Sequence, residues 1–596
     1  MKSSATLVAG IDLGTTNSAL AYAALPTARE TPSVTPFEIP QLVRAADFRP
    51  WPLLPSSLFL PGDADFPPGA TALPWDENPA WVVGELARAR GSEIPSRLVV
   101  SAKSWLSHSA VDRTSALLPL EAPDGIARVS PVEASRRYLE HLRHAWDHVN
   151  PDTPLEAQHV LVTVPASFDA VARDLTLRAA SEAGFGDVVL LEEPQAAFYA
   201  WLERHADWRE RVSPGDLVLV VDVGGGTTDF SLIAITAEDG ELTLERVAVG
   251  DHILLGGDNM DLALAHGVAQ SLGRKLSSSQ MHALWQSARA AKEGLFANPD
   301  RADHPVTILG KGSGVVGGAI KAKLERAVLE STVLDGFFPQ APAGAEPEDP
   351  RSSGINEIGL PYAADAAVTR HLARFLRQAG PGNNRGGKMA APTHVLFNGG
   401  VFLAPALRQR LLGVLNGWLG EHKLPAAKAL EGDDLMHAVS RGAAYYGLAR
   451  AGHGIRIRGG VARSYYIGIK PAMPAIPGVK PPLRALTVAQ AGMEEGTRIQ
   501  PGRREFALRV GQQCDFRFFS SVERHADQPG EMLEEIGGDM EELAPIEVTL
   551  PGAEAESVPV TLETEITETG MLQLWCVARD GRRWKLEFNV REKVGG

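Results

Sequence analysis

The chain has 596 residues, with 58 Lys and Arg against 73 Asp and Glu, which gives a formal net charge of −15. This length exceeds what one hydrophobic core usually supports, so we expect two or more domains. The acidic balance argues against nucleic acid and against an anionic membrane surface as partners.

The N-terminal segment MKSSATLVAGIDLG runs directly into a strand pattern, without the apolar core or cleavage site of a signal peptide. No apolar run approaches the length of a membrane-spanning helix. We therefore expect a cytoplasmic protein. Its two cysteines, Cys514 and Cys576, are expected to be free thiols in apolar strands, although a bridge between them is the alternative.

Short β-branched runs alternate with helical patterns over the first three-quarters of the chain. The strand-like runs are TLVAGIDLG (6–14), HVLVTVPAS (159–167), DLVLVVDVG (216–224) and THVLFNGG (393–400). Helical patterns follow them, as in 169–184 and 404–419. This alternation predicts an α/β architecture with ligands at the carboxyl ends of the strands.

The sequence pattern changes near Ile455, where short strand-like runs begin to alternate with Gly, Pro and acidic turns. We therefore expect an α/β domain over 1–452 and a β-rich domain over 453–596. Two polar segments rich in Pro or Gly, 339–350 and 379–392, are expected to be loops.

Two glycine-rich turns resemble each other: GIDLGTTNS at 10–18 and VDVGGGTTDF at 221–230. One such turn is weak support for phosphate binding, because most glycine-rich turns are only turns. Two copies, each after a strand, suggest a duplicated fold that closes on a ligand from both sides. Two unrelated hairpins are the alternative.

These turns have the composition of a site for a magnesium nucleotide. Glycines let several backbone N–H groups converge on an anion. Four threonines can add hydroxyl donors: Thr15, Thr16, Thr227 and Thr228. Asp12, Asp222 and Asp229 would repel a bare phosphate, so a cation between them is implied. Mg²⁺ is commonly held by carboxylates, water and phosphate oxygens.

Six segments follow one another along the chain: GIDLGTTNS, VTVPASFDAVARDLTLRAASEAGF, LLEEPQAAFYAW, VDVGGGTTDFSL, LGGDNMD and VLFNGGVF. Their order and spacing resemble those of the Hsp70 (DnaK-type) chaperones, of the actin and sugar-kinase superfamily. VGELARARGSEIPSRLVVSAKSWLS is similar to the segment with that family's catalytic lysine. The resemblance implies a duplicated actin-like (ribonuclease H-like) ATPase domain followed by an all-β sandwich-like domain.

The resemblance also implies roles for particular residues. Lys103 would place the attacking water, Glu193 would orient the water shell of the metal, and Asp229 would align the nucleophile, with Thr227 beside it. Asp12 and Asp222 would hold Mg²⁺ through water, with K⁺ as a second cation. The implied nucleotide contacts are Gly14, Thr15, Thr16, Asn17, Gly224, Gly225, Gly226, Thr227, Lys292, Gly399 and Gly400.

From the residues alone, Lys103 could instead be a surface lysine and Glu193 a simple strand-end acid. The adenosine side departs from the family pattern. The family continues its Gly-Gly turn with serine and an arginine that stacks on adenine, where this chain has Val401 and Leu403. On the facing helix the lysine is retained, and the acidic and basic residues around it are exchanged as Arg289 and Glu293.

The C-terminal part resembles a divergent substrate-binding β-domain, in RSYYIGI and TETGMLQLWCVA. A β-domain with exposed edges can receive an extended peptide, and contact with a partner protein alone is the alternative. No helical pattern follows the last strand, so we expect no helical lid and fast peptide exchange. Met473 and Ile476 are candidate apolar contacts to peptide.

We therefore expect an Hsp70-like chaperone that binds and hydrolyses ATP and binds unfolded peptide or a client protein. A co-chaperone or an exchange factor would be a further partner. Two alternatives remain: an ATP-binding scaffold with little turnover, and a small-molecule kinase of the same superfamily. Fold alone does not separate them.

Overall fold

The structure is a computed structural model. It describes residues 5–589 except 27–32, 109, 121, 124, 239–240, 274, 309–319, 349–359, 361, 381–388, 433, 454–460, 462, 472–482, 495, 522–523, 525, 538 and 544–545. The chain divides into two compact units: one contains 1–235 and 246–456 with the last three residues, and the other contains 236–245 and 457–593. Within the described residues, no helix is both long enough and apolar enough to cross a membrane.

The first sheet of the larger unit is built around a central hairpin. In order, its strands are β11 (Val188–Glu192), β10 (His159–Val164), β1 (Leu7–Leu13), β2 (Asn17–Ala24) and β3 (Thr35–Pro36), and β6 (Leu54–Pro55) pairs with β2. β1 runs antiparallel to β2 and parallel to β10. β1 is buried along nearly its whole length, as its continuous apolar run predicts for a central strand.

The second sheet repeats this arrangement. In order, its strands are β14 (Glu241–Val249), β13 (Thr228–Glu238), β12 (Leu217–Val223), β17 (His394–Asn398) and β18 (Lys428–Leu430). β12 runs antiparallel to β13 and parallel to β17. Read from β18 to β14, the second sheet has the strand order of the first. The central strand of each sheet, β1 or β12, runs antiparallel to the strand that follows it and parallel to its other neighbour.

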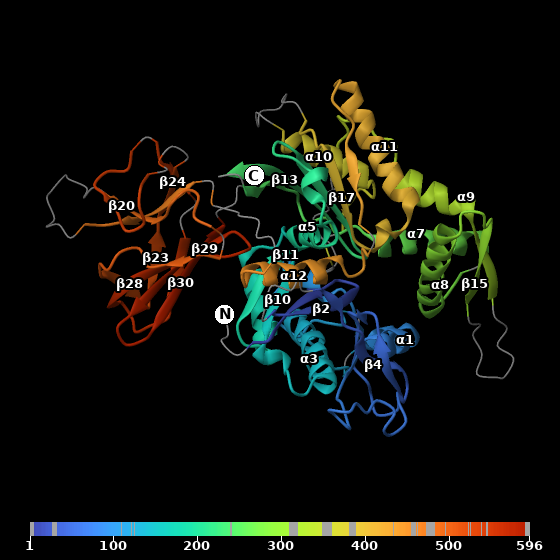
Figure 1. The fold of residues 1–596 in the computed structure, drawn as a ribbon. Coiled ribbons are helices and arrows are strands. Elements are labelled where there is room, and N and C mark those ends of the chain that lie inside the picture. The colour runs from blue at the N-terminus through green and yellow to red at the C-terminus, as the bar shows by residue number, and fades with distance from the viewer. Residues whose placement is uncertain are drawn as a thin grey trace. The chain divides into compact units, whose positions relative to one another are not determined.

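Helices cover the two sheets and define two lobes, each with its own hydrophobic core. The first lobe carries α1 (Glu85–Glu93), α2 (Ala102–Leu106), α3 (Pro131–Val149) and α4 (Ala170–Glu182). The second carries α7 (Gly257–Ser271), α8 (Ser278–Ala297), α10 (Val368–Gln378) and α11 (Pro405–Glu421). Helices α5 (Glu193–Arg204) and α12 (Ala438–Arg450) pack on each other between the lobes (Figure 1).

The described part of the smaller unit consists of antiparallel strands. One sheet contains β25 (Met532–Leu533), β20 (Arg484–Ala489), β19 (Ser464–Ile469), β24 (Phe518–Ser521) and β26 (Glu541–Glu542). Another contains β21 (Arg498–Ile499), β22 (Phe506–Val510), β28 (Glu556–Ile566), β29 (Met571–Ala578) and β30 (Arg583–Asn589), and β23 (Gln513–Phe516) pairs with β27 (Ile546–Thr549). Side chains of both main sheets, Val488 and Leu574 among them, share one core.

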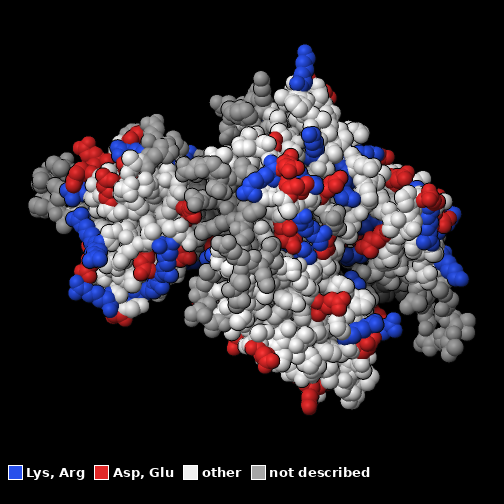
Figure 2. Space-filling view, in the orientation of Figure 1, with Lys and Arg blue, Asp and Glu red and all other residues white. Residues whose placement is uncertain are grey.

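Both cysteines are free, as the sequence predicts. Cys576 lies in the core of the smaller unit, where burial raises the pKa of its thiol to about 12. On the face of the molecule in Figure 2, basic and acidic side chains are interspersed rather than gathered into patches of one sign.

Candidate functional site: a cleft between two glycine turns

The first glycine turn, Gly14–Asn17, connects β1 to β2 in the first lobe. It is fixed by Ser56, which sequence reasoning did not identify. The Ser56 hydroxyl donates to the carbonyl of Gly14 at 2.7 Å, and the Ser56 N–H donates to the carbonyl of Thr16 at 2.9 Å. Because Ser56 donates hydrogen bonds to two carbonyls of the turn, contacts within the protein hold the shape of the turn.

The second turn, Gly224–Thr227, connects β12 to β13 and is fixed by the start of helix α7. The backbone N–H of Gly257 donates to the Gly224 carbonyl at 3.0 Å, and that of Asp258 donates to the Gly225 carbonyl at 2.7 Å. The N-terminal N–H groups of a helix lack partners within the helix. Here they hold the carbonyls of Gly224 and Gly225, while the Gly224 N–H donates to the Thr227 carbonyl at 2.9 Å and closes the turn.

The two turns lie face to face across a cleft of about 1360 Å³. A Cβ atom added to Gly225 would lie 1.9 Å from Oγ1 of Thr16, and one added to Gly226 would lie 2.8 Å from Cγ2 of Thr15. The glycines are thus required by the close approach of the opposite lobe. The paired turns seen in the sequence do meet in space.

An aspartate ends the central strand of each sheet, and its neighbour on the adjacent parallel strand contacts it. Asp12 lies in register with Thr163, whose hydroxyl is 3.5 Å from the Asp12 carboxylate. Asp222 lies in register with Asn398, whose side-chain N–H donates to the Asp222 carboxylate at 2.6 Å. In each lobe, the residue that pairs with this aspartate on the adjacent parallel strand is therefore polar.

Lys103 and Glu193 meet at the floor of the same cleft. Lys103 is the second residue of α2, which begins after Ser101, a residue with a left-handed φ of 56°. Glu193 begins α5. Their side chains form a buried ion pair, with only 9% and 11% of each exposed. Non-glycine residues with such strained backbone cluster at functional sites. A surface position for Lys103, the alternative from the sequence, is therefore wrong.

Burial and mutual repulsion dominate the electrostatics of these acids. Burial, reinforced by Glu193, raises the pKa of Asp12 to about 7 and that of Asp222 to about 8. Burial opposes the charge of Lys103, but Glu193 and Asp12 outweigh it and raise the pKa of the lysine. One lysine faces three carboxylates, so a cation is needed for all three to ionise at neutral pH.

The residues present fit a hydrated Mg²⁺ rather than a directly ligated metal. Among the described residues, no three His, Cys, Asp or Glu side chains gather closely enough to ligate one ion. The side-chain oxygen of Asn398 is buried, and it has no hydrogen-bond partner among the described residues. Mg²⁺ usually retains several waters and takes one or two carboxylates, and Asp12 and Asp222 supply two.

The metal-free protein should lose stability as the pH rises. The pKa values of Asp12 and Asp222 are raised from 3.8 to about 7 and about 8. Their contribution to the free energy of unfolding is therefore fully present below pH 3.8 and is lost as the pH rises to these values. Thermal unfolding in chelator should show a falling Tm over this window. Adding Mg²⁺ and nucleotide should make Tm less dependent on pH. Asp222→Asn should make the decrease of Tm in chelator smaller. A chelated wild type with constant Tm would contradict this assignment.

Asp229 lies on β13, just behind the second turn, and is buried. Its carboxylate accepts a hydrogen bond from Ser167 and contacts His252. Thr227 lines the cleft, whereas Thr228 is buried and its hydroxyl donates to the carbonyl of Leu255 at 2.7 Å. Thr228 is therefore committed to the protein interior, and its expected role as a donor to phosphate is wrong.

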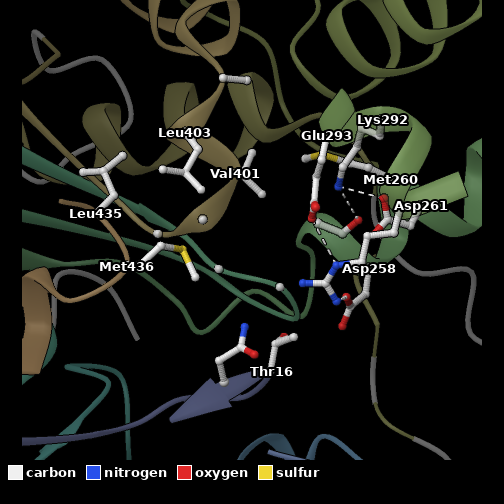
Figure 3. A pocket seen from close by; sticks show the side chains of 18 of the residues that line it. Thr16, Asp258, Met260, Asp261, Lys292, Glu293, Val401, Leu403, Leu435 and Met436 are labelled. Atoms are coloured by element: carbon white, nitrogen blue, oxygen red, sulfur yellow. Dashed lines mark hydrogen bonds and ion pairs between the residues drawn. The ribbon is translucent and has the colours of Figure 1, made fainter. Parts of the chain in front are cut away.

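The wider end of the cleft has an apolar wall and a charged wall (Figure 3). The apolar side consists of Val401, Leu403, Leu435 and Met436. Leu403 is 53% exposed, so its side chain is accessible to a ligand in the cleft. Gly399 precedes this wall in the chain and has a left-handed φ of 88°. A Cβ atom at Gly399 would lie 2.3 Å from the Val223 carbonyl oxygen. Gly399 and Gly400 both line the cleft.

The charged wall comes from α7 and α8. Lys292 is held by Asp261, with 2.7 Å between Nζ and Oδ1. Arg289 lies 3.8 Å from Asp258 and 3.2 Å from Glu293. Figure 3 shows Asp258, Asp261, Lys292 and Glu293 together on this side of the cleft. The exchanged charges noted in the sequence therefore form an ion-pair chain along one side of the cleft.

Most of the residues predicted for the metal, for catalysis and for the nucleotide line this cleft, whereas Gly226 and Asp229 do not belong to its lining. Sequence reasoning missed Ser56, Thr163, Asn398, Ser167 and His252. The only local signal was polarity at the ends of apolar strands, as at Thr163 and Asn398. Met473 and Ile476, the predicted peptide contacts, lie outside the described residues.

Comparison with known proteins gives consistent matches. The family model described as Hsp70 protein matches residues 76–337. A chaperone protein HscA homolog of Bordetella pertussis is 32% identical over 336 residues, which are 54% of this chain and 46% of that protein. A homolog of the same name from Pseudomonas aeruginosa is 32% identical over 48% of this chain and 42% of its own length. One from Paracidovorax citrulli is 37% identical over 30% and 27%.

The fold and the cleft define a mixed α/β protein in which paired glycine turns line a cleft that also contains acidic side chains and a buried lysine. Its sequence matches show that residues 76–337 resemble the Hsp70 family model and that the chain is similar to curated HscA chaperone homologs. The matches span less than half the length of these relatives.

Proposed function

We propose that this chain is an Hsp70-like chaperone ATPase that binds Mg-ATP between its two lobes and hydrolyses it to ADP and phosphate. The observation that carries the proposal is the buried ion pair of Lys103 and Glu193, which lies with the half-buried Asp12 and Asp222 in the cleft that the two glycine turns line. Phosphoryl transfer depends mainly on positioning and on neutralising developing charge. A buried lysine and a cation beside converging N–H groups supply both.

Each residue has a distinct task in this proposal. The N–H groups and hydroxyls of Gly14–Asn17 hold the phosphates from the first lobe, and Gly224–Thr227 hold them from the second. Asp12 and Asp222 would hold Mg²⁺, which would supply positive charge against the phosphate oxygens. Lys103 polarises the attacking water, and Glu193 orients Lys103 through their ion pair. Asp229 aligns the same water.

The β-rich unit is proposed to bind an extended peptide or a client protein. Its described sheets end in short edge strands, β25 and β26 on one side of the core, and an unpaired edge can accept a further strand. The nucleotide state would reach this unit through the relative position of the two lobes. Phosphate contacts on both lobes make their closure dependent on ATP.

The test is steady-state ATP hydrolysis by the wild-type chain, with and without an extended apolar peptide. We expect slow turnover that requires Mg²⁺ and increases with peptide. Tight ATP binding without turnover would favour a scaffold. Transfer of the γ-phosphate to a sugar would favour a small-molecule kinase and would overturn the proposal.

An ATP-binding scaffold with little turnover is the stronger alternative to a chaperone ATPase. The reason lies in the side chains at the part of the cleft where the nucleoside is expected. Leu403 stands exposed at the position where the resemblance places an arginine over adenine. Arg289 and Lys292 are both engaged by neighbouring acids. A base would thus be held by apolar packing against Val401 and Leu403, with fewer charged contacts.

Replacing Leu403 by arginine should raise the affinity for ATP. A guanidinium over an aromatic face at an exposed site contributes about 0.5–1 kcal/mol, so we expect Kd to fall about two- to fivefold. Calorimetric titration with Mg-ATP measures this change. Leu424→Arg is the matched control, since Leu424 is also an exposed leucine, 39% accessible and outside the cleft. Equal effects of the two substitutions would exclude stacking at residue 403.

A further inference from the structure

Three polar side chains from the two lobes meet directly behind the phosphate turns. Ser167 belongs to the loop between β10 and α4 of the first lobe, Asp229 to β13 of the second, and His252 to the segment between β14 and α7. The Ser167 hydroxyl donates to Oδ1 of Asp229 at 2.7 Å. Nδ1 of His252 lies 3.1 Å from the same oxygen and 3.0 Å from the Ser167 hydroxyl. We call these three residues the interlobe latch.

The geometry determines where the protons lie. Ser167 has one hydrogen, which it gives to the carboxylate, so its oxygen can only accept from His252. Nδ1 faces two oxygen acceptors at hydrogen-bond distance and must therefore carry a hydrogen. The imidazole thus serves as an Nδ1–H donor shared between Asp229 and Ser167.

The other ring nitrogen of His252, Nε2, does not contact Asp229 or Ser167. Nε2 of His252 is buried and has no hydrogen-bond partner among the described residues, and the ring packs against Phe168, 6.0 Å away between centroids. In a catalytic triad, the two ring nitrogens serve the serine and the aspartate separately. Here one nitrogen contacts both, so Ser167 is not activated as a nucleophile. The arrangement is instead one that holds a carboxylate.

The held carboxylate is Asp229, whose proposed task is to align the attacking water. Burial opposes its ionisation, but His252 and Ser167 outweigh burial and lower its pKa. Both contacts end on Oδ1, which leaves Oδ2 outside the latch. Two donors on one oxygen fix the rotation of the carboxylate plane and therefore the direction of Oδ2.

We propose that Ser167 and His252 are positioning residues that orient Asp229 and make this orientation depend on lobe closure. The dependence arises because Ser167 and Phe168 come from the first lobe, whereas Asp229 and His252 come from the second. Opening of the cleft would withdraw one of the two donors from Oδ1. The inference rests on the proposed ATP hydrolysis and adds to it a coupling between closure and water alignment.

The test compares two replacements of His252 that differ in the position of one N–H. In asparagine, the side-chain amide lies near the position of Nδ1, whereas in glutamine it lies near that of Nε2. We expect His252→Gln to reduce kcat for ATP hydrolysis about ten- to a hundredfold while KM changes little. His252→Asn should retain most of the activity. Ser167→Ala should resemble His252→Gln, and Ser167→Thr should resemble the wild type.

Two controls separate positioning from damage to the fold. His422→Gln replaces an exposed histidine after α11 and should leave kcat unchanged. In an Asp229→Asn background, His252→Gln should cause little further loss, since residues that act as one unit are not additive. Equal losses from His252→Asn and His252→Gln, or full additivity with Asp229→Asn, would overturn the proposal.

A readout independent of turnover keeps the two proposals distinct. ¹⁵N NMR of the imidazole should find Nδ1 of His252 protonated and slow to exchange, and Ser167→Ala should shift this signal. An unprotonated Nδ1 would overturn the latch even in an inactive protein. A wild type that binds ATP without hydrolysing it would instead overturn the proposed ATPase. Turnover that is insensitive to Ser167→Ala and His252→Gln would overturn the latch alone.

Discussion

Replacing Lys103 by alanine should reduce ATP turnover about a hundred- to a thousandfold, as loss of one preorganised electrostatic group commonly does. Lys103 is buried beside Glu193, and Asp12 and Asp222 both act on its pKa. Its removal takes away the positive charge that polarises the water and leaves three acids facing one another. The measurement is single-turnover hydrolysis at saturating Mg-ATP, so that altered binding is not mistaken for altered chemistry.

Lys321→Ala is the matched control, because Lys321 is an exposed lysine on β16 (Ile320–Glu325). It should hydrolyse ATP at the wild-type rate. Lys103→Ala should still bind Mg-ATP, since the glycine turns and both aspartates remain. A Lys103→Ala protein with near-normal single-turnover rates would rule out the catalytic role assigned to this lysine.

Replacing Gly225 by alanine should weaken Mg-ATP binding about ten- to a hundredfold, which corresponds to an overpacking cost of about 1–3 kcal/mol. The added Cβ would lie 1.9 Å from Oγ1 and 2.9 Å from Cβ of Thr16. Because Thr16 belongs to the opposite lobe, the clash acts on closure of the cleft rather than on the core of either lobe. Calorimetric titration with Mg-ATP measures the loss.

Gly413→Ala serves as the control for this substitution, because a Cβ at Gly413 of α11 meets nothing within 4 Å. It should bind Mg-ATP normally and be slightly more stable, since alanine favours a helix over glycine. Thermal unfolding of Gly225→Ala should stay near the wild-type value. A large fall in its Tm together with unchanged affinity would mean that the glycine serves folding rather than closure.

Local sequence patterns predict many of the elements around the cleft. The helix expected over 169–184 is α4, Ala170–Glu182, and the one expected over 404–419 is α11, Pro405–Glu421. Asp169 caps α4 by accepting the N–H of Ala172 at 2.7 Å. Such features depend on neighbours within a few residues, so periodicity and capping residues are enough to locate them.

Contacts between distant segments could not be predicted in this way. Lys103 and Glu193 are 90 residues apart, and Asp222 and Asn398 are 176 apart. Whether Asn398 faces Asp222 depends on the register between β12 and β17, and a shift by one residue would turn its side chain to the other face. Ser167 lies within one of the family-like segments and His252 within none, and no local pattern gave either residue a role.

The sequence by itself determined the paired glycine turns, the strand-end acids and the net acidity, because each is written in consecutive residues. Only the tertiary structure decided that the turns approach closely enough to exclude a Cβ, that Lys103 is buried, and that Thr228 faces away from the cleft. It also decided that Asp229 is held by one residue from each lobe. These outcomes depend on how two separately packed lobes meet, and no local pattern encodes that meeting.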